Sequence, residues 1–395
     1  MSEWKEVRLG DICSIFGRIG FSGYTTEDLV KTPNEDAISL SPSNIVHGDL
    51  NFEKLTYINW NKYEESPEIQ IKKNDILLVK TGSSIGRTTI VNEVYHPMTL
   101  NPQMVVLKDI KINPLYLSYL MKGYNFQGLI RGIAGGSAIP TLSQKHLSAL
   151  KITICDIKTQ NEIAKIISPL DSKIAVNRRI CENLEAQAQA LFKHWFIDFA
   201  PFLDKPSGKA ERKNGKFVES ELGMIPEGWR VGKLEELVDI KYGKDHKKLN
   251  EGNIPAYGSA GLMRTVDEKL YDGESVLIPR KGTLNNIMYV NEAFWTVDTM
   301  FYTIPKKSNI LKYLYMKLKR IDFNKMNVGT SIPSNSTSQL NKLKIVIPTD
   351  EILSRFDGIM SSLLQELMHS QKESKGLATL RDSLLLKLMS GQIKV

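Results

Sequence analysis

The sequence predicts an α+β protein built as an internal repeat, with two similar globular segments and two long helices. A twenty-residue segment recurs in the second half of the 395-residue chain. Each copy is followed by apolar residues in alternating steps of four and three, the pattern of paired helices. Each copy is preceded by strand-like stretches that end in turn residues. A chain of this length is expected to form two or three domains, each with its own core.

The repeat appears when "GGSAIPTLSQKHLSALKITI" at 135–154 is compared with "VGTSIPSNSTSQLNKLKIVI" at 328–347. The second copy lies 193 residues after the first, and the two align without a gap. Agreement at so many positions is hard to reach by chance, so we expect both segments to fold alike. The matched pairs are Gly136 and Gly329, Ile139 and Ile332, Pro140 and Pro333, Leu147 and Leu340, Leu150 and Leu343, Lys151 and Lys344, Ile152 and Ile345, and Ile154 and Ile347.

The segments upstream of each copy are expected to form the two globular domains. One begins near Trp4, and the other begins with "GWRVGKLEEL", which contains Trp229. Between the halves, "DKPSGKAERKNGKF" at 204–217 combines Pro, Gly and basic residues, a composition typical of a linker. The expected divisions are 1–155 for the first domain, 156–203 for a central helical region, 204–222 for the linker, 223–349 for the second domain and 350–395 for a C-terminal helical region.

The regularly spaced apolar residues after each copy of the repeat form a seam, the line of contact along a helix. Each seam is a heptad pattern about 30 residues long, which as a helix spans roughly 45–50 Å. Taken singly, each is also explained as an amphipathic helix lying on a domain core, but two matched seams favour mutual pairing. Asn177 and Ser370 place a polar residue at the same depth in both, and Arg381 interrupts the second seam. The seam residues are Ile163, Ile167, Leu170, Ile174, Asn177, Cys181, Leu184, Ala188, Leu191 and Trp195 in the first copy, and Phe356, Met360, Leu363, Leu367, Ser370, Ser374, Leu377, Leu384 and Leu388 in the second.

Two residues are weak points of the predicted helices. Pro169 is expected either to kink the first helix or to mark its effective start, because proline lacks the N–H that a helix interior uses. Gly376 is less favourable than alanine in a helix by about 1 kcal/mol.

Composition narrows the class of partner. The formal net charge of +8 favours a polyanion, with nucleic acid first and an anionic membrane surface second. No apolar run approaches the roughly 20 residues that a spanning helix needs. The start, "MSEWKEVRLGD", carries no pattern of a secretion signal. Three widely spaced cysteines fit neither a disulfide framework nor a zinc site, so we expect a reducing cytoplasm and no metal in this chain.

The complete pattern resembles the DNA-specificity (S) subunit of type I restriction–modification enzymes. The resemblance covers essentially the whole chain. It is carried by "LFKHWFIDFAPF" at 191–202, "GMIPEGWRVGKLEEL" at 223–237, the two "AIP/SIP…LKI" segments and "LLLKLMSGQIKV" at 384–395.

This resemblance implies a non-catalytic subunit that recognises double-stranded DNA. Two target recognition domains, related by a pseudo-twofold repeat, would each read one half of a split target. The two helices would pack antiparallel as a coiled-coil spacer between them. Two modification subunits, which use S-adenosylmethionine to methylate adenine, would dock around the spacer, and restriction subunits would add an ATP- and Mg-dependent nuclease. The setting would be the prokaryotic cytoplasm, with no cofactor in this chain and no membrane partner.

One segment suggests a rival function. "LLVKTGSSIGRTTIV" at 77–91 looks like a phosphate loop, but its G-x-x-x-G spacing is one residue short of a Walker A motif and lacks the lysine. Its counterpart "LIPRKGTLNNIMYV" at 277–290 has Gly282 where the first copy has Gly82, but Asn286 where it has Gly86. This difference suits two readers of different sequences better than a nucleotide site. The alternatives are a nucleotide-dependent enzyme that uses the Gly82 loop, and a coiled-coil adaptor without DNA specificity.

Residue type and loop position predict the DNA contacts, since Arg, Lys, Asn, Gln, Ser and Thr make most contacts to phosphates and base edges. An ordinary solvated loop is the competing explanation for each residue. The predicted contacts are Ser41, Ser43, Asn44, Lys80, Thr81, Ser83, Ser84 and Arg87 in the first domain, and Lys244, His246, Lys247, Tyr257, Ser259, Arg280, Lys281, Thr283, Asn285 and Asn286 in the second.

The aromatic residues that end the first helix allow two interpretations. Trp195, Phe196 and Phe199 either pack the end of the spacer itself or form an interface with a modification subunit, where aromatic side chains are favoured anchors.

Overall fold

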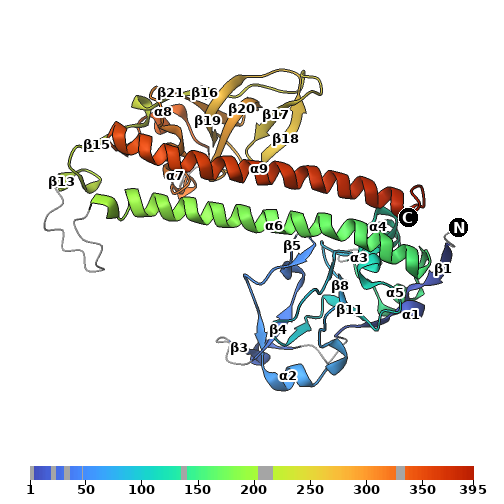
Figure 1. Cartoon of the computed structure of the whole chain (residues 1–395). Coiled ribbons are helices and arrows are strands. Elements are labelled where there is room, and N and C mark those ends of the chain that lie inside the picture. Colours follow the sequence, from blue (N-terminus) through green and yellow to red (C-terminus); the bar gives the residue numbers. More distant parts are fainter. Residues whose placement is uncertain are drawn as a thin grey trace. The chain divides into compact units, whose positions relative to one another are not determined.

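The computed structural model describes residues 4–18, 24–30, 36–46, 48–134, 140–202, 217–325 and 334–395 (Figure 1). The chain forms two compact units. Unit 1 comprises Met1–Ala175 and Ser374–Val395, and unit 2 comprises Val176–Glu373. Several residues of the sequence repeat, namely Gly136, Ile139, Gly329, Ile332 and Pro333, lie outside the described residues.

Two four-stranded sheets form the centre of unit 1, with orders β2-β11-β8-β9 and β10-β4-β7-β3. The strands β8 and β11 are buried along their whole length, as expected for the apolar runs "ILLV" and "MVVLK". The strands are β1 (Lys5–Arg8), β2 (Ser14–Phe16), β3 (Leu29–Val30), β4 (Ala37–Leu40), β5 (Ile45–Val46), β6 (Asp49–Leu50), β7 (Tyr57–Ile58), β8 (Ile76–Val79), β9 (Thr88–Ile90), β10 (Met98–Leu100), β11 (Met104–Lys108) and β12 (Lys151–Ile154). The helices before the long one are α1 (Leu9–Ile12), α2 (Trp60–Glu64), α3 (Pro114–Lys122), α4 (Tyr124–Ile133) and α5 (Gln144–Ala149).

A six-stranded sheet of order β16-β21-β19-β20-β17-β18 forms the centre of unit 2. Its first four strands repeat the order β2-β11-β8-β9 of unit 1, and β17 and β18 extend it. The strands are β13 (Phe217–Ser220), β14 (Gly223–Pro226), β15 (Arg230–Lys233), β16 (Val238–Tyr242), β17 (Ile254–Gly258), β18 (Gly261–Val266), β19 (Tyr271–Pro279), β20 (Met288–Thr296), β21 (Met300–Pro305) and β22 (Lys344–Ile347). The short helices are α7 (Leu311–Leu318) and α8 (Thr337–Asn341).

The sequence repeat is also a repeat of hydrogen bonding. In unit 1, β1 pairs with β12, and the amide of Leu9 donates to Leu150 O at 2.8 Å. In unit 2, β15 pairs with β22, and the amide of Leu234 donates to Leu343 O at 3.0 Å. Serine side chains cap α5 and α8 at matched positions, because Ser143 and Ser336 each accept from a backbone N–H in the first turn of the helix.

The long helices are α6 (Ile157–Phe196) and α9 (Asp350–Met389), each of 40 residues. Each contributes residues to both units. Pro169 lies inside α6, so the alternative that it marks the start of the helix is wrong: the helix begins twelve residues earlier, with Ile157. None of the described helices is long and apolar enough to cross a membrane.

Within each unit the two helices pair antiparallel, as predicted. In unit 2, Phe192 near the end of α6 contacts Phe356 near the start of α9, and the Asn177 amide donates to Glu373 at 2.7 Å. In unit 1, Ile163 shares a buried cluster with Leu388. Residue numbers therefore rise along one helix as they fall along the other. The residues of the predicted seams are all buried or half-buried.

The expected linker at 204–222 is only partly a linker. Residues 217–220 form β13, which pairs antiparallel with β14. Residues 221 and 222 form the turn between these strands, and residues 204–216 lie outside the described residues.

Candidate nucleic-acid interface

The loop between β8 and β9, residues 80–87, is held in unit 1 by its main chain. The Lys80 amide donates to Gln103 O, and the Leu142 amide donates to Lys80 O, each at 2.8 Å. Thr81 forms an isolated antiparallel bridge with Thr141. The loop is therefore fixed at its base, while Ser83 and Arg87 are exposed.

Both glycines of this loop adopt positive φ angles, but only one is tightly packed. Gly82 has φ +100° and open space where a Cβ would lie. Gly86 has φ +84°, and a Cβ there would approach Gln127 Oε1 to 2.8 Å. The glycines serve the turn and its packing on α4, where Gln127 Nε2 donates to Gly86 O at 2.9 Å.

Arg87 joins this loop to the second predicted contact segment of unit 1. Its Nη1 donates to Ile45 O at 3.0 Å, directly after Ser41, Ser43 and Asn44. Asn44 differs from its neighbours because its side chain is buried and fully used. Its Oδ1 accepts from the Ser41 amide at 2.9 Å, and its Nδ2 donates to Lys54 O at 3.0 Å. Asn44 shapes the loop and does not present its amide to solvent, contrary to the predicted DNA contact.

Lys80 is half-buried, and its amine donates to Arg18 O at 3.2 Å. Burial lowers the pKa of this amine, since the charged form loses hydration. The contact with Arg18 O therefore holds the Lys80 amine at a fixed position at the base of the loop.

The loop of unit 2 between β19 and β20, residues 280–287, is held in the same way. The Arg280 amide donates to Thr299 O at 2.8 Å, and the Asn335 amide donates to Arg280 O at 2.9 Å. Lys281 bridges Ser334, as Thr81 bridges Thr141 in unit 1. Gly282 has φ +87°, close to the φ of Gly82. The two loops are therefore equivalent structures with different side chains.

Several of the residues predicted to contact DNA in unit 2 form hydrogen bonds within the unit. Asn286 Nδ2 donates to Ser259 O at 2.9 Å, which fixes the β17–β18 turn against the loop. Asn285 is tied to the segment after α7, where its amide donates to Asp322 at 3.0 Å. Tyr257 donates to Glu292 at 2.8 Å, and burial raises the pKa of its hydroxyl. Asn285 and Tyr257 have these partners, whereas Lys281 and Thr283 are exposed at the tip of the loop.

A third segment of unit 2 reaches the same region through the turn between β20 and β21. The Lys244 amide donates to Thr296 O at 2.9 Å, and Arg280 Nη1 donates to Asp298 O at 3.2 Å. The side chains of Lys244 and Lys247 are exposed, whereas His246 is half-buried. The exposed cations of this surface therefore include Lys244, Lys247 and Lys281.

Sequence reasoning missed Tyr242, the last residue of β16. Tyr242 is 51% exposed, and the Arg280 guanidinium lies 5.6 Å from the centroid of its ring. A weak signal was present in the sequence, since this aromatic residue lies two positions before Lys244, where the predicted contact segment begins.

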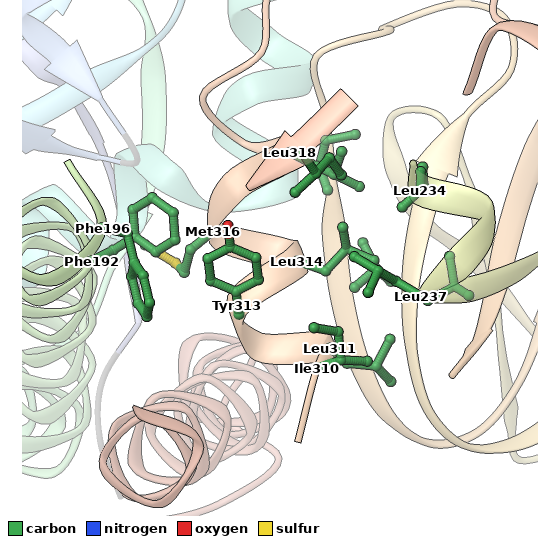
Figure 2. Close-up of a cluster of buried hydrophobic side chains, with 14 of the residues drawn as sticks. Phe192, Phe196, Leu234, Leu237, Ile310, Leu311, Tyr313, Leu314, Met316 and Leu318 are labelled. Carbon is green, nitrogen blue, oxygen red and sulfur yellow. The ribbon is translucent and has the colours of Figure 1, made fainter. Parts of the chain in front are cut away.

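The aromatic residues that end α6 belong to the core of unit 2 (Figure 2). Phe196 lies 4.8 Å, centroid to centroid, from both Tyr313 and Phe356. Trp195 is buried as well, and Phe199 packs on Trp229. The interpretation of these three residues as a partner interface is therefore wrong for Trp195 and Phe196, because they are only 8% and 6% exposed. They pack the end of the helix itself.

Comparison with known proteins decides the family. The profile described as "Type I restriction modification DNA specificity domain" matches residues 1–186 and 226–375. This chain belongs to that family. The two matched regions cover most of both units.

Relatives match most or all of this specificity subunit. The type I restriction enzyme HindI specificity subunit of Haemophilus influenzae is 24% identical and is covered completely, as is this chain. The MjaVIII specificity subunit of Methanocaldococcus jannaschii is 32% identical over 83% of this chain and 81% of its own. The crystal structure of a type I S subunit from M. genitalium has the same fold, with a TM-score of 0.64 over 98% of this chain and 96% of that one at 18% identity.

These findings confirm the predicted fold class and the predicted role as a type I specificity subunit. Neither the nucleotide-dependent enzyme nor the adaptor without DNA specificity is supported. The Gly82 loop is matched by a loop in unit 2 that lacks its second glycine, so the repeat explains it as one of two equivalent elements.

Proposed function

We propose that this specificity subunit reads a bipartite duplex DNA target, with the 80–87 loop of unit 1 facing one half-site and the 280–287 loop of unit 2 facing the other. The observation that carries the proposal is the common anchoring of the two loops. Leu142 holds Lys80 as Asn335 holds Arg280, yet the exposed residues differ. A constant scaffold with variable tips is what two readers of unlike sequences require.

The surroundings of both loops suit DNA. Exposed Arg87 in unit 1 and Lys244, Lys247 and Lys281 in unit 2 supply cations for phosphates. Exposed Ser83 and Thr283 occupy matched places and accept or donate hydrogen bonds to base edges. Base reading needs both classes of contact, since phosphate contacts position a protein and base contacts specify the sequence.

In this proposal the chain carries no catalytic activity and no cofactor. Two modification subunits would bind S-adenosylmethionine and methylate adenine after flipping it from the duplex. Restriction subunits would supply the ATP- and Mg-dependent nuclease. The complex would act in the prokaryotic cytoplasm, where its DNA substrate lies. Equilibrium dialysis of the isolated chain should show no binding of S-adenosylmethionine or ATP, and saturable binding of either would contradict this part.

The central experiment maps methylated adenines in DNA from cells that carry this subunit with its partner subunits. We expect two fixed half-sites at constant spacing. Arg87→Ala should weaken DNA binding or relax the first half-site alone, and Lys281→Ala should act on the second alone. Lys165→Ala, on an exposed position of α6, is the matched control for loss of one positive charge.

Two results would overturn the proposal. One is a single continuous target. The other is a loop variant that changes both half-sites equally while its thermal unfolding matches that of the wild type.

A further inference from the structure

Tyr242 and Arg280 form a cation–π pair at the edge of the proposed DNA surface of unit 2. The guanidinium carbon lies 5.6 Å from the centroid of the tyrosine ring. The ring is itself fixed, because it packs edge-on against Phe301 at 5.0 Å and its hydroxyl lies 3.3 Å from Thr337 Oγ1. A half-exposed aromatic ring in this position orients the cation that lies on it.

The backbone fixes Arg280 from the other side. Its own amide and carbonyl are bonded to Thr299 and Asn335, and its Nη1 donates to Asp298 O at 3.2 Å. Within the described part of the chain the guanidinium makes no other hydrogen bond. A guanidinium has five N–H donors in one plane, so most of its donor edge has no partner among the described residues.

Unit 1 has different residues at the positions that correspond to Tyr242 and Thr337. Strand register places Gly17 of unit 1 where unit 2 has Tyr242, and the sequence repeat places Gln144 where unit 2 has Thr337. Gln144 Nε2 donates to Gly17 O at 3.3 Å. A Cβ at Gly17 would lie 2.9 Å from Val105 Cγ1 and 3.0 Å from Met104 O, so a tyrosine fits there only if these neighbours shift.

The cations at this place differ accordingly. Lys80 of unit 1 donates its amine to the carbonyl of Arg18, the residue after Gly17. The guanidinium of Arg280 in unit 2 instead lies over the Tyr242 ring, and most of its planar donor edge has no partner among the described residues. Lysine is a point charge, whereas arginine matches two acceptors in one plane.

We propose that Arg280 reads a guanine in the second half-site through its free edge, and that Tyr242 is the positioning residue that holds it for this contact. The inference rests on the proposed function of unit 2 as a DNA reader. Guanine presents O6 and N7 side by side in the major groove, and a bidentate arginine is the commonest specific contact to it. A phosphate contact alone needs neither planarity nor a ring, and the neighbouring Lys281 already supplies an exposed charge for one.

The test uses the complete complex with its modification subunits and duplexes that carry the mapped target. Each guanine of the second half-site is replaced in turn by 7-deazaguanine, which lacks the N7 acceptor. For the wild type, one replacement should weaken binding about 10-fold, the scale of one good bidentate contact. Arg280→Ala should lose sensitivity to that replacement, and Arg280→Lys should lose most of it.

Tyr242 variants separate positioning from folding. Tyr242→Phe keeps the ring on Arg280 and should keep sensitivity to 7-deazaguanine. Tyr242→Leu keeps apolar packing on Phe301 without an aromatic face and should lose it, with binding to the first half-site unchanged. Lys319→Ala is the matched control, because Lys319 lies 5.2 Å from the Tyr315 ring in a second cation–π pair outside the loop.

The outcomes keep the two proposals distinct. Uniformly weaker binding of Arg280→Ala to all duplexes, with full sensitivity to 7-deazaguanine, would assign Arg280 to phosphate and overturn this inference while leaving the bipartite reader intact. Unchanged sensitivity in Tyr242→Leu would overturn the role of Tyr242. A target without a second half-site would remove the proposed function itself.

Discussion

Asp171 of α6 and Arg381 of α9 form an ion pair of 2.8 Å in unit 1, at places where unit 2 has two apolar residues. The repeat of 193 residues puts Leu364 at the place of Asp171 and Ala188 at the place of Arg381. Leu364 and Ala188 lie buried in one cluster. The charge of Arg381, which interrupts the seam, is thus matched by Asp171 on the partner helix, and the helix pairs of the two units differ chemically at this position.

Removal of one member of this pair should destabilise unit 1. In Asp171→Ala or Arg381→Ala a half-buried charge loses its partner on the other helix, although Arg381 keeps its pair with Asp382. We expect the free energy of unfolding to fall by about 1–3 kcal/mol. The double variant Asp171→Leu with Arg381→Ala copies unit 2 and should recover most of this loss. Denaturant unfolding measures each value. Glu6→Ala, which breaks the exposed pair of Glu6 with Lys151, is the control and should change less than about 0.5 kcal/mol. Equal effects of Asp171→Ala and Glu6→Ala would contradict the prediction.

Phe196→Ala tests whether the aromatic end of α6 is core. The ring is buried between Tyr313 and Phe356, so its removal should lower the free energy of unfolding by about 3–5 kcal/mol. The adjacent Ile197 is 38% exposed, and Ile197→Ala should lower it by less than about 1 kcal/mol. Thermal and denaturant unfolding of both variants measure these changes in the free energy of unfolding. A stable Phe196→Ala protein that fails only to bind modification subunits would restore the interface interpretation.

The thiols should react slowly and in a defined order. Burial raises the pKa of Cys13 to about 12 and also raises the pKa of Cys155. Burial, with Glu185 and Glu182 nearby, raises the pKa of Cys181, the one cysteine of the three that is only half-buried. A raised pKa lowers the thiolate fraction at pH 8, and the thiolate is the reactive form. Reaction with a chromogenic disulfide at pH 8 should therefore be slow, should begin at Cys181 and should accelerate as the pH rises. Cys181→Ser should remove the first phase, and an unchanged first phase would show that the order is wrong.

The spacing of the proposed bipartite target should follow the length of the helices. A four-residue insertion after Ala175, matched by four residues after Glu373, lies at the boundary of the units in both helices and preserves helix pairing within each unit, including the hydrogen bond from Asn177 to Glu373. It lengthens each helix by about 6 Å and turns its far end by about 40°. At about 3.4 Å per base pair we expect the gap between half-sites to grow by about two base pairs. Methylation mapping measures the gap, and an unchanged gap in an active complex would contradict the prediction.

Much of the fold was predictable because the internal repeat indicates which segments fold alike. Identical residues such as Leu147 and Leu340 are buried in matched places, and helical periodicity marked the seam residues that pack between α6 and α9. Local chemistry also predicted where the loops lie, since apolar strands such as Ile76–Val79 must end at turn residues. The DNA contacts assigned to these loops stay predictions.

The sequence by itself determined the repeated architecture and the family, because both depend on residue identity and spacing along the chain. Only the tertiary structure decided which side chains are free. By residue type, Asn44 is a candidate for DNA contact and Phe196 is a candidate for a partner interface. In the structure, the Asn44 side chain bonds to backbone groups, and Phe196 is buried in the core of unit 2. The partnership of Tyr242 with Arg280 likewise required the fold, because β16 and the β19–β20 loop meet only through their shared neighbour β21. Burial and pairing between segments distant in the chain are set by packing, which periodicity does not encode.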